Sequence, residues 1–107
     1  SFRVGQRVQA RQSPASDCDA LLTPTPGSLT FAINQPRVAS GLVVTQAEVH
    51  EAMRFAFEHL ALVLEPGGAV CLAALLAKAV PVTGETVLAT LSGGNVDPGP
   101  YAEILQG

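Results

Sequence analysis

The chain has 107 residues and a formal net charge of −3, and only 14% of its residues are charged, where a soluble domain usually carries about 25%. Its six Lys and Arg residues are scattered, which argues against binding a nucleic-acid backbone. The longest apolar run, 69–77, is shorter than the roughly 20 residues that a membrane span needs.

Hydrophobic residues make up 48% of the chain, and two interpretations fit this apolar composition. The chain is either a very compact domain or a piece of something larger that normally covers part of its surface. No signal segment follows Ser1, and two cysteines, Cys18 and Cys71, make no disulfide framework, which fits a cytoplasmic location. We expect Cys71 to be buried as a small hydrophobic residue.

The N-terminal part of the chain is weakly patterned. Turn signals such as Ser13-Pro14 are frequent there, and residues 17–22 form a candidate ordered segment. Residues 29–38 predict a short helix that ends near Pro36. The apolar residues 41–44 then predict a short buried strand.

A capping-box pattern at Thr45 and Glu48 predicts the start of an amphipathic helix. Apolar residues at helical spacing give that helix one hydrophobic face: Val49, Ala52, Met53, Ala56, Leu60, Val63 and Leu64. We expect the helix to end at Glu65, because the following proline disfavours helical geometry in the residue before it.

Two more helices and one more strand are predicted after Glu65. The run 69–77 is apolar on every side, which is typical of a helix buried all round. Residues 86–91 predict a buried strand, and Asp97-Pro98 predicts the start of a last helix that runs to about Leu105. The alternating order predicts an α/β fold: a partial three-layer sandwich with a small, mainly parallel sheet flanked by helices.

The loop LSGGNVDPG, residues 91–99, follows a predicted strand, where ligands bind in open parallel sheets. Gly93 and Gly94 would let a ligand approach the backbone, while Ser92 and Asn95 offer side-chain hydrogen bonds. An ordinary tight turn with a polar lining explains the same residues.

Glu65 is a second candidate site residue, either because its carboxylate faces the same site or because a helix dipole favours an anion there. A metal site is not expected. His50 and His59 lie nine residues apart on one predicted helix and point in opposite directions. No His and Cys residues have zinc-site spacing.

Four stretches in order resemble a known family: SDCDALLTPTPGSLTFAI, VTQAEVHEAMRFAFEHLALVLEPGGAV, LAALLA and LSGGNVDP. They are similar to the C-terminal third of the threonine/serine dehydratases, pyridoxal-phosphate (PLP) ammonia-lyases of fold type II related to serine racemase. The segments EPGGA and SGGNVD carry most of the specificity. The sequence most resembles the dehydratases associated with hydroxyectoine breakdown. Asp17 and Ala61 differ from the residues usual at these positions in that subgroup.

This resemblance implies that residues 1–107 are the C-terminal portion of a large, cofactor-binding domain. In the family, a serine hydroxyl at the position of Ser92 faces the pyridine nitrogen of PLP. The cofactor-binding residues implied in this chain are Ser92, Gly93, Gly94, Asn95 and Glu65. The substrate of the longer parent would be a hydroxyamino acid, converted to a 2-oxoacid and ammonia.

The family's Schiff-base lysine, glycine-rich phosphate loop and divalent-cation ligands lie in motifs that these residues lack. The single lysine, Lys78, ends the apolar helix, where it favours the negative helix end. We therefore expect no catalytic residue, no stable PLP binding and no dehydratase activity in this chain alone. The alternative is a stand-alone, non-catalytic assembly or binding module that reuses the scaffold. Uncovered edges and apolar patches predict a homo-oligomer or association with the missing part of the enzyme.

Overall fold

The computed structural model describes residues 1–10 and 16–107. These residues form two compact units, Ser1–Leu42 and Val43–Gly107. The turn expected at Ser13-Pro14 lies outside the described residues. No helix of the described residues combines the length and the apolar character that crossing a membrane requires.

The described part of the first unit contains three short helical elements: η1 (Phe2–Val4), η2 (Asp19–Leu21) and α1 (Ser28–Asn34). The Phe2 ring stacks on the Phe31 ring of α1 with 5.2 Å between centroids. The Gln35 side-chain amide donates to the carbonyl oxygen of Gly5 over 3.1 Å. The helix predicted near residues 29–38 is thus confirmed, and η2 lies within the candidate ordered segment.

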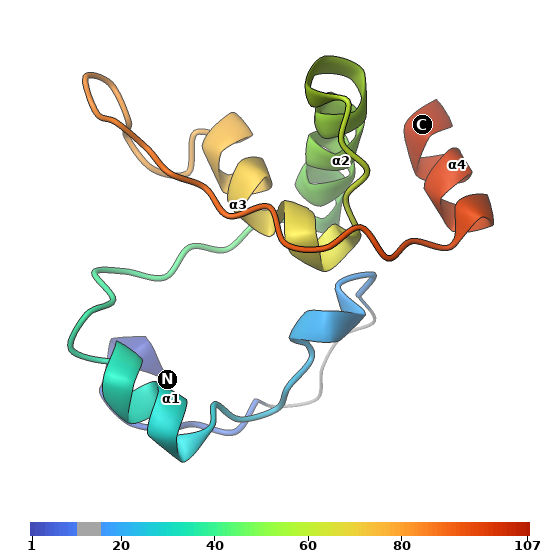
Figure 1. Ribbon diagram of the computed structural model, residues 1–107. Helices are drawn as coiled ribbons and strands as arrows, with labels where there is room; N and C mark the ends of the chain where they lie inside the picture. The colour runs from blue at the N-terminus through green and yellow to red at the C-terminus, as the bar shows by residue number, and fades with distance from the viewer. Residues whose placement is uncertain (11–15) are drawn as a thin grey trace. The chain divides into compact units, whose positions relative to one another are not determined.

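The second unit contains α2 (Gln46–Leu60), α3 (Pro66–Leu76) and α4 (Pro98–Gln106), with α2 between the other two (Figure 1). The predicted capping box begins α2. The Glu48 N–H donates to Thr45 Oγ1 over 3.3 Å, and the Thr45 N–H donates to Glu48 Oε2 over 2.6 Å. This reciprocal pair satisfies two backbone donors that the first helical turn leaves free.

The core of the second unit lies where α3 and α4 pack on α2. Its buried residues are Val49, Ala52, Met53, Ala56, Leu64, Ala69, Ala73 and Tyr101. Alanines at the α2–α3 contact let the two helix backbones approach closely. On the other side, the Tyr101 ring meets the Phe57 ring edge to face, with 6.3 Å between centroids.

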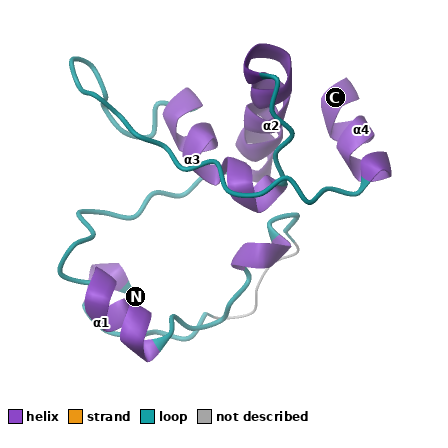
Figure 2. Ribbon diagram, viewed as in Figure 1, coloured by secondary structure: helices purple, strands orange, loops and turns teal. Residues whose placement is uncertain are grey.

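The predicted α/β sandwich is wrong: the described residues form helices and loops without a strand (Figure 2). Both predicted strands are exposed loops, with Val43 89% exposed and Leu88 97% exposed. Their β-branched, apolar residues favour extended backbone, but a strand also needs a neighbouring strand to pair with its N–H and C=O groups. Within the described residues, neither segment has that neighbour.

Three helix details also differ from the predictions. Helix α2 ends at Leu60, and the next residue, Ala61, is left-handed with φ 55°, so the helix stops before Glu65. Only one stripe of α3 is buried, and Cys71 is exposed rather than buried. Hydrophobic sequence alone does not bury a helix when no second partner covers its outer face. The start of α4 after Asp97 is confirmed, although the Asp97 side chain makes no cap hydrogen bond.

Candidate functional site

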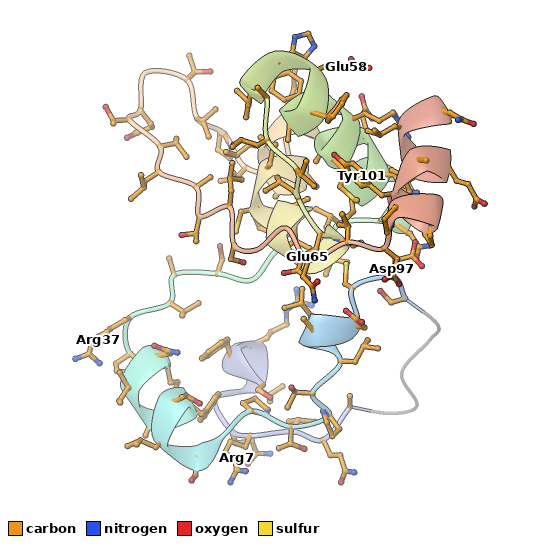
Figure 3. All side chains as sticks on the ribbon, turned by 45° about the vertical axis from the view of Figure 1, so that its right-hand side comes forward. Arg7, Arg37, Glu58, Glu65, Asp97 and Tyr101 are labelled. Atoms are coloured by element: carbon orange, nitrogen blue, oxygen red, sulfur yellow. The ribbon has the colours of Figure 1, made fainter. Side chains whose placement is uncertain are left out.

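The two segments that the sequence singled out meet in the second unit. The backbone N–H of Glu65 donates to the carbonyl oxygen of Gly93 over 3.2 Å. Glu65 is the N-cap of α3 and Pro66 occupies its first turn, so the start of this helix is fixed by local chemistry. Figure 3 shows Glu65 and Asp97 on the same side of the second unit. The contact therefore joins the beginning of α3 to the loop that precedes α4.

Glycines make this close contact possible. Gly93 has φ +84°, a conformation that L side chains rarely adopt, and a Cβ atom there would overlap Glu65 Oε1. A Cβ atom on Gly94 would lie 2.5 Å from the carbonyl oxygen of Val63. A Cβ atom on Gly68 would overlap the carbonyl oxygen of Ser92. The backbone contacts of Gly68 and Gly94 thus leave no room for a side chain, and Gly93 is favoured by its positive φ.

The polar side chains of the site are accessible. Ser92 and Asn95 are exposed and Glu65 is half-buried. No hydrogen bond from another described residue engages these three side chains. Within the loop, the Val96 N–H donates to the Gly94 carbonyl over 3.0 Å, and the Gly93 carbonyl accepts from the Glu65 N–H. This part of the unit therefore carries an accessible hydroxyl, amide and carboxylate.

Lys78 and Tyr101 lie away from this site. Among the described residues, no three His, Cys, Asp or Glu side chains gather as a metal site would require. Lys78 follows the opposite end of α3, which is roughly 16 Å long at 1.5 Å per residue, so its backbone lies far from the Glu65 end. Burial raises the pKa of Tyr101, but this ring lies in the α2–α4 contact rather than in the loop.

Known proteins resemble this chain over nearly all its length. An L-threo-3-hydroxyaspartate ammonia-lyase from Pseudomonas sp. is 37% identical over 107 residues, which is 100% of this chain and 33% of that protein. The crystal structure of a threonine deaminase from T.th. superposes with a TM-score of 0.80 at 34% identity, covering 90% of this chain and 32% of that chain. The chain matches one part of the ammonia-lyase and serine racemase family.

A solved serine racemase from Dictyostelium discoideum gives the same picture. Its TM-score is 0.79 at 33% identity, and the match covers 90% of this chain and 30% of that chain. The chain thus spans about a third of the length of the relatives it matches. No family model matches the sequence. The match to the Pseudomonas protein spans the whole of this chain, including its EPGGA and SGGNVD segments, so the resemblance to one part of this family is supported.

The structure places Gly93 against Glu65 and the Ser92 carbonyl against Gly68, while Asn95 is exposed in the same loop. The cofactor-binding role of these residues stays a prediction. Sequence reasoning missed two contributors. Gly68 was visible in EPGGA, but nothing in the sequence indicated that its missing Cβ accommodates the Ser92 carbonyl. Val63 was assigned to the hydrophobic face of the predicted helix, whereas its backbone carbonyl oxygen occupies the space that a Cβ atom on Gly94 would need. Backbone contacts of this kind leave little signal in a single sequence.

Proposed function

We propose that this chain is the part of a PLP-dependent hydroxyamino acid ammonia-lyase that forms the wall beside the cofactor ring. In this proposal, the Ser92 hydroxyl faces the pyridine nitrogen, and Gly93, Gly94 and Asn95 shape the wall around it. Glu65 lies beside the ring. The Schiff-base lysine and the phosphate loop belong to polypeptide that corresponds to the rest of the relatives.

One observation carries this proposal: the hydrogen bond from the Glu65 N–H to the Gly93 carbonyl. It joins the two short segments that are most specific for the family, although they are well separated along the chain. A tight turn alone explains the loop glycines. It does not explain why residue 68 of α3 is also a glycine, whose missing Cβ atom leaves room for the Ser92 carbonyl oxygen.

The side chains present fit a heteroaromatic ring nitrogen. A hydroxyl both donates and accepts hydrogen bonds, so Ser92 can donate to an unprotonated ring nitrogen. Being neutral, this hydroxyl does not hold a proton on the nitrogen as a carboxylate would. When bound, PLP supplies an electron sink for carbanion chemistry. A ring without that proton is a weaker sink, which favours loss of the β-hydroxyl over other fates of the substrate.

The substrate class follows from the relatives' names. The Pseudomonas and Saccharomyces cerevisiae relatives are named for L-threo-3-hydroxyaspartate, and others are named for threonine or for serine racemisation. Hydroxyaspartate, threonine and serine all carry a hydroxyl on the carbon next to the amino-bearing carbon. We therefore propose a β-hydroxy-α-amino acid as the substrate of the complete enzyme, with 2-oxoacid and ammonia as products. Membership in the hydroxyectoine-breakdown subgroup remains part of this proposal.

A partner polypeptide is part of the proposal as well. Val43 and Leu88 are almost fully exposed, and the outer face of α3 is uncovered in this chain. The relatives are about three times as long as this chain and so contain material that could cover such a surface. Homo-oligomerisation through the same surface is the competing outcome, and light scattering at increasing protein concentration distinguishes the two.

Two measurements test the function. First, the chain mixed with PLP and with serine, threonine or hydroxyaspartate is expected to give neither a visible absorbance band from bound cofactor nor a 2-oxoacid. Second, a chimera is made in which this chain replaces the matching third of the Pseudomonas ammonia-lyase. The chimera is expected to bind PLP and release ammonia from L-threo-3-hydroxyaspartate. A folded chimera that binds no PLP would refute the proposal and favour a non-catalytic module.

A further inference from the structure

Helix α4 carries the candidate loop at its N-terminal end, and it is too short to be stable alone. It has nine residues, Pro98–Gln106, and isolated helices below about 12–15 residues are marginal in water. Its N-cap, Asp97, makes no side-chain cap hydrogen bond, and Tyr101 is its only buried residue among those described. Contacts with α2 must therefore hold it in place.

Arg54 of α2 makes the polar contact of this kind. Its Nη1 donates to the carbonyl oxygen of Ile104 over 2.9 Å, across 50 residues of sequence. Ile104 lies in the last turn of α4, where carbonyl groups lack a partner within the helix and carry the negative end of the helix dipole. A half-buried guanidinium at this point is a charge-assisted cap supplied by another helix.

The loop before α4 is held at two points. At one point, the Gly93 carbonyl accepts from the Glu65 N–H of α3. At the other, the chain enters α4 at Pro98. Only residues 94–97 lie between them, so Gly93 and Pro98 can be at most about 18 Å apart when the chain is fully extended. A shift of α4 therefore pulls directly on this short connection and on the Gly93 contact.

We infer that Arg54 is a positioning residue for the loop of Ser92 and Asn95, acting through α4 without touching the loop. It fixes the C-terminal end of α4, the Tyr101–Phe57 ring contact fixes the middle, and the N-terminal end then holds the loop against Glu65. The inference rests on the proposed function only in regarding this loop as the cofactor wall. The contacts from which it is argued lie within this chain and need no cofactor.

Amide hydrogen exchange by NMR on the 107-residue chain tests this inference without any cofactor. Arg54→Met keeps much of the aliphatic stem and removes the donor, while Arg54→Lys keeps a positive charge that can reach a carbonyl. Glu51→Ala, an exposed charged position of the same helix, is the matched control. The reporters are the N–H groups of Glu65 and Val96 for the loop, Tyr101 for α4 and Glu48 for the remote capping box.

Arg54→Met is expected to raise exchange at Tyr101, Glu65 and Val96 by about tenfold or more, because loss of a charge-assisted hydrogen bond raises the population of locally open states. Glu48 should keep its rate, Arg54→Lys should recover part of the protection, and Glu51→Ala should change none of the reporters. Faster exchange at Tyr101 with unchanged rates at Glu65 and Val96 would show that Arg54 only caps α4, and would overturn the inference.

If Arg54→Met does not fold, Arg54→Gln keeps a neutral donor and is measured in its place, with the same expected order of rates. Because the Gln side chain is two atoms shorter and uncharged, it does not reproduce the bond from Arg54 Nη1 to Ile104, so equal rates for Arg54→Gln and the unchanged chain at all loop reporters would also overturn the inference. A chimera that fails to bind PLP would count against the proposed function but would leave these exchange rates as they are. The two failures are therefore distinguishable.

Discussion

The backbone N–H of Glu65 and the carbonyl oxygen of Gly93 are 3.2 Å apart, and this hydrogen bond fastens the loop before α4 to the N-cap residue of α3. Gly93 at φ +84° leaves its α-carbon facing Glu65 Oε1 without a side chain between them. The candidate site thus depends on one backbone contact that glycine alone permits.

Replacing Gly93 by alanine should separate the loop from α3. The positive φ strains an alanine here, and the new methyl group would force the end of the Glu65 side chain to rotate away, so we expect a loss of about 1–2 kcal/mol in the free energy of unfolding. Gly84→Ala is the matched control, because Gly84 has φ +78° with open space around it. It should show only the backbone strain of about 1 kcal/mol. Chemical denaturation of both variants measures the difference.

A double substitution separates collision from strain at the same position. Glu65→Ala removes the carboxylate that Gly93→Ala would strike, so the pair should be less destabilised than the sum of the two single changes. The coupling free energy is expected to be about 1 kcal/mol in the rescuing direction. Strict additivity would mean that the methyl group does not meet Glu65.

Gly68→Ala tests the other side of the contact. Alanine inside a helix usually stabilises by about 1 kcal/mol relative to glycine, but here the methyl group would overlap the Ser92 carbonyl oxygen. We expect net destabilisation and faster amide exchange at Glu65. Gly99→Ala in the first turn of α4, where a Cβ meets nothing within 4 Å, should be neutral or slightly stabilising. A stabilised Gly68→Ala variant would contradict the close approach of loop and helix.

Ala61 is left-handed at the end of α2, with φ 55°, where glycine is the favoured residue. Ala61→Gly should raise the free energy of unfolding by about 0.5–1 kcal/mol, which corresponds to a melting temperature several degrees higher. Ala77→Gly provides the control at the end of α3, because φ is −73° there and glycine brings only added unfolded-state freedom. In thermal unfolding followed by circular dichroism, the melting temperature should rise for Ala61→Gly and fall for Ala77→Gly.

Tyr101 predicts a pH dependence. Its buried hydroxyl has no hydrogen-bond partner among the described residues, and burial raises its pKa above the ordinary value of 10.0. The unfolded chain therefore loses this proton at lower pH than the folded chain, so the stabilisation is complete below about pH 10 and is lost as the pH rises through the folded-state pKa. Tyr101→Phe should lack this alkaline component and should be as stable as the unchanged chain, or more so, at neutral pH. Denaturation curves at several pH values compare the two.

Local chemistry was predictable from the sequence where neighbouring residues decide the structure. The Thr45–Glu48 capping box needs only a hydroxyl and a carboxylate three residues apart, and both hydrogen bonds are present. The proline starts of α3 and α4 rest on the same kind of local rule. Glu65 and the Ser92 loop were singled out from similar local signals, and they do lie in contact, but their role in binding a cofactor stays a prediction.

Pairing and burial were not predictable, because they depend on residues far away or absent. The segments around Val43 and Leu88 have strand composition, yet within the described residues no second strand pairs with them. Cys71 lies in an apolar helix, but only the stripe of α3 that faces α2 is covered. Composition alone does not reveal which face of an apolar element finds a partner.

The most direct test of the proposed role of Ser92 is the nitrogen-15 chemical shift of ring-labelled PLP bound to the chimera with the Pseudomonas ammonia-lyase. With Ser92 in place, the ring nitrogen should resonate in the unprotonated range, and Ser92→Asp should move it to the protonated range because a carboxylate stabilises the added proton. An identical shift in both proteins would contradict the account, since the side chain at position 92 would then not face the ring nitrogen.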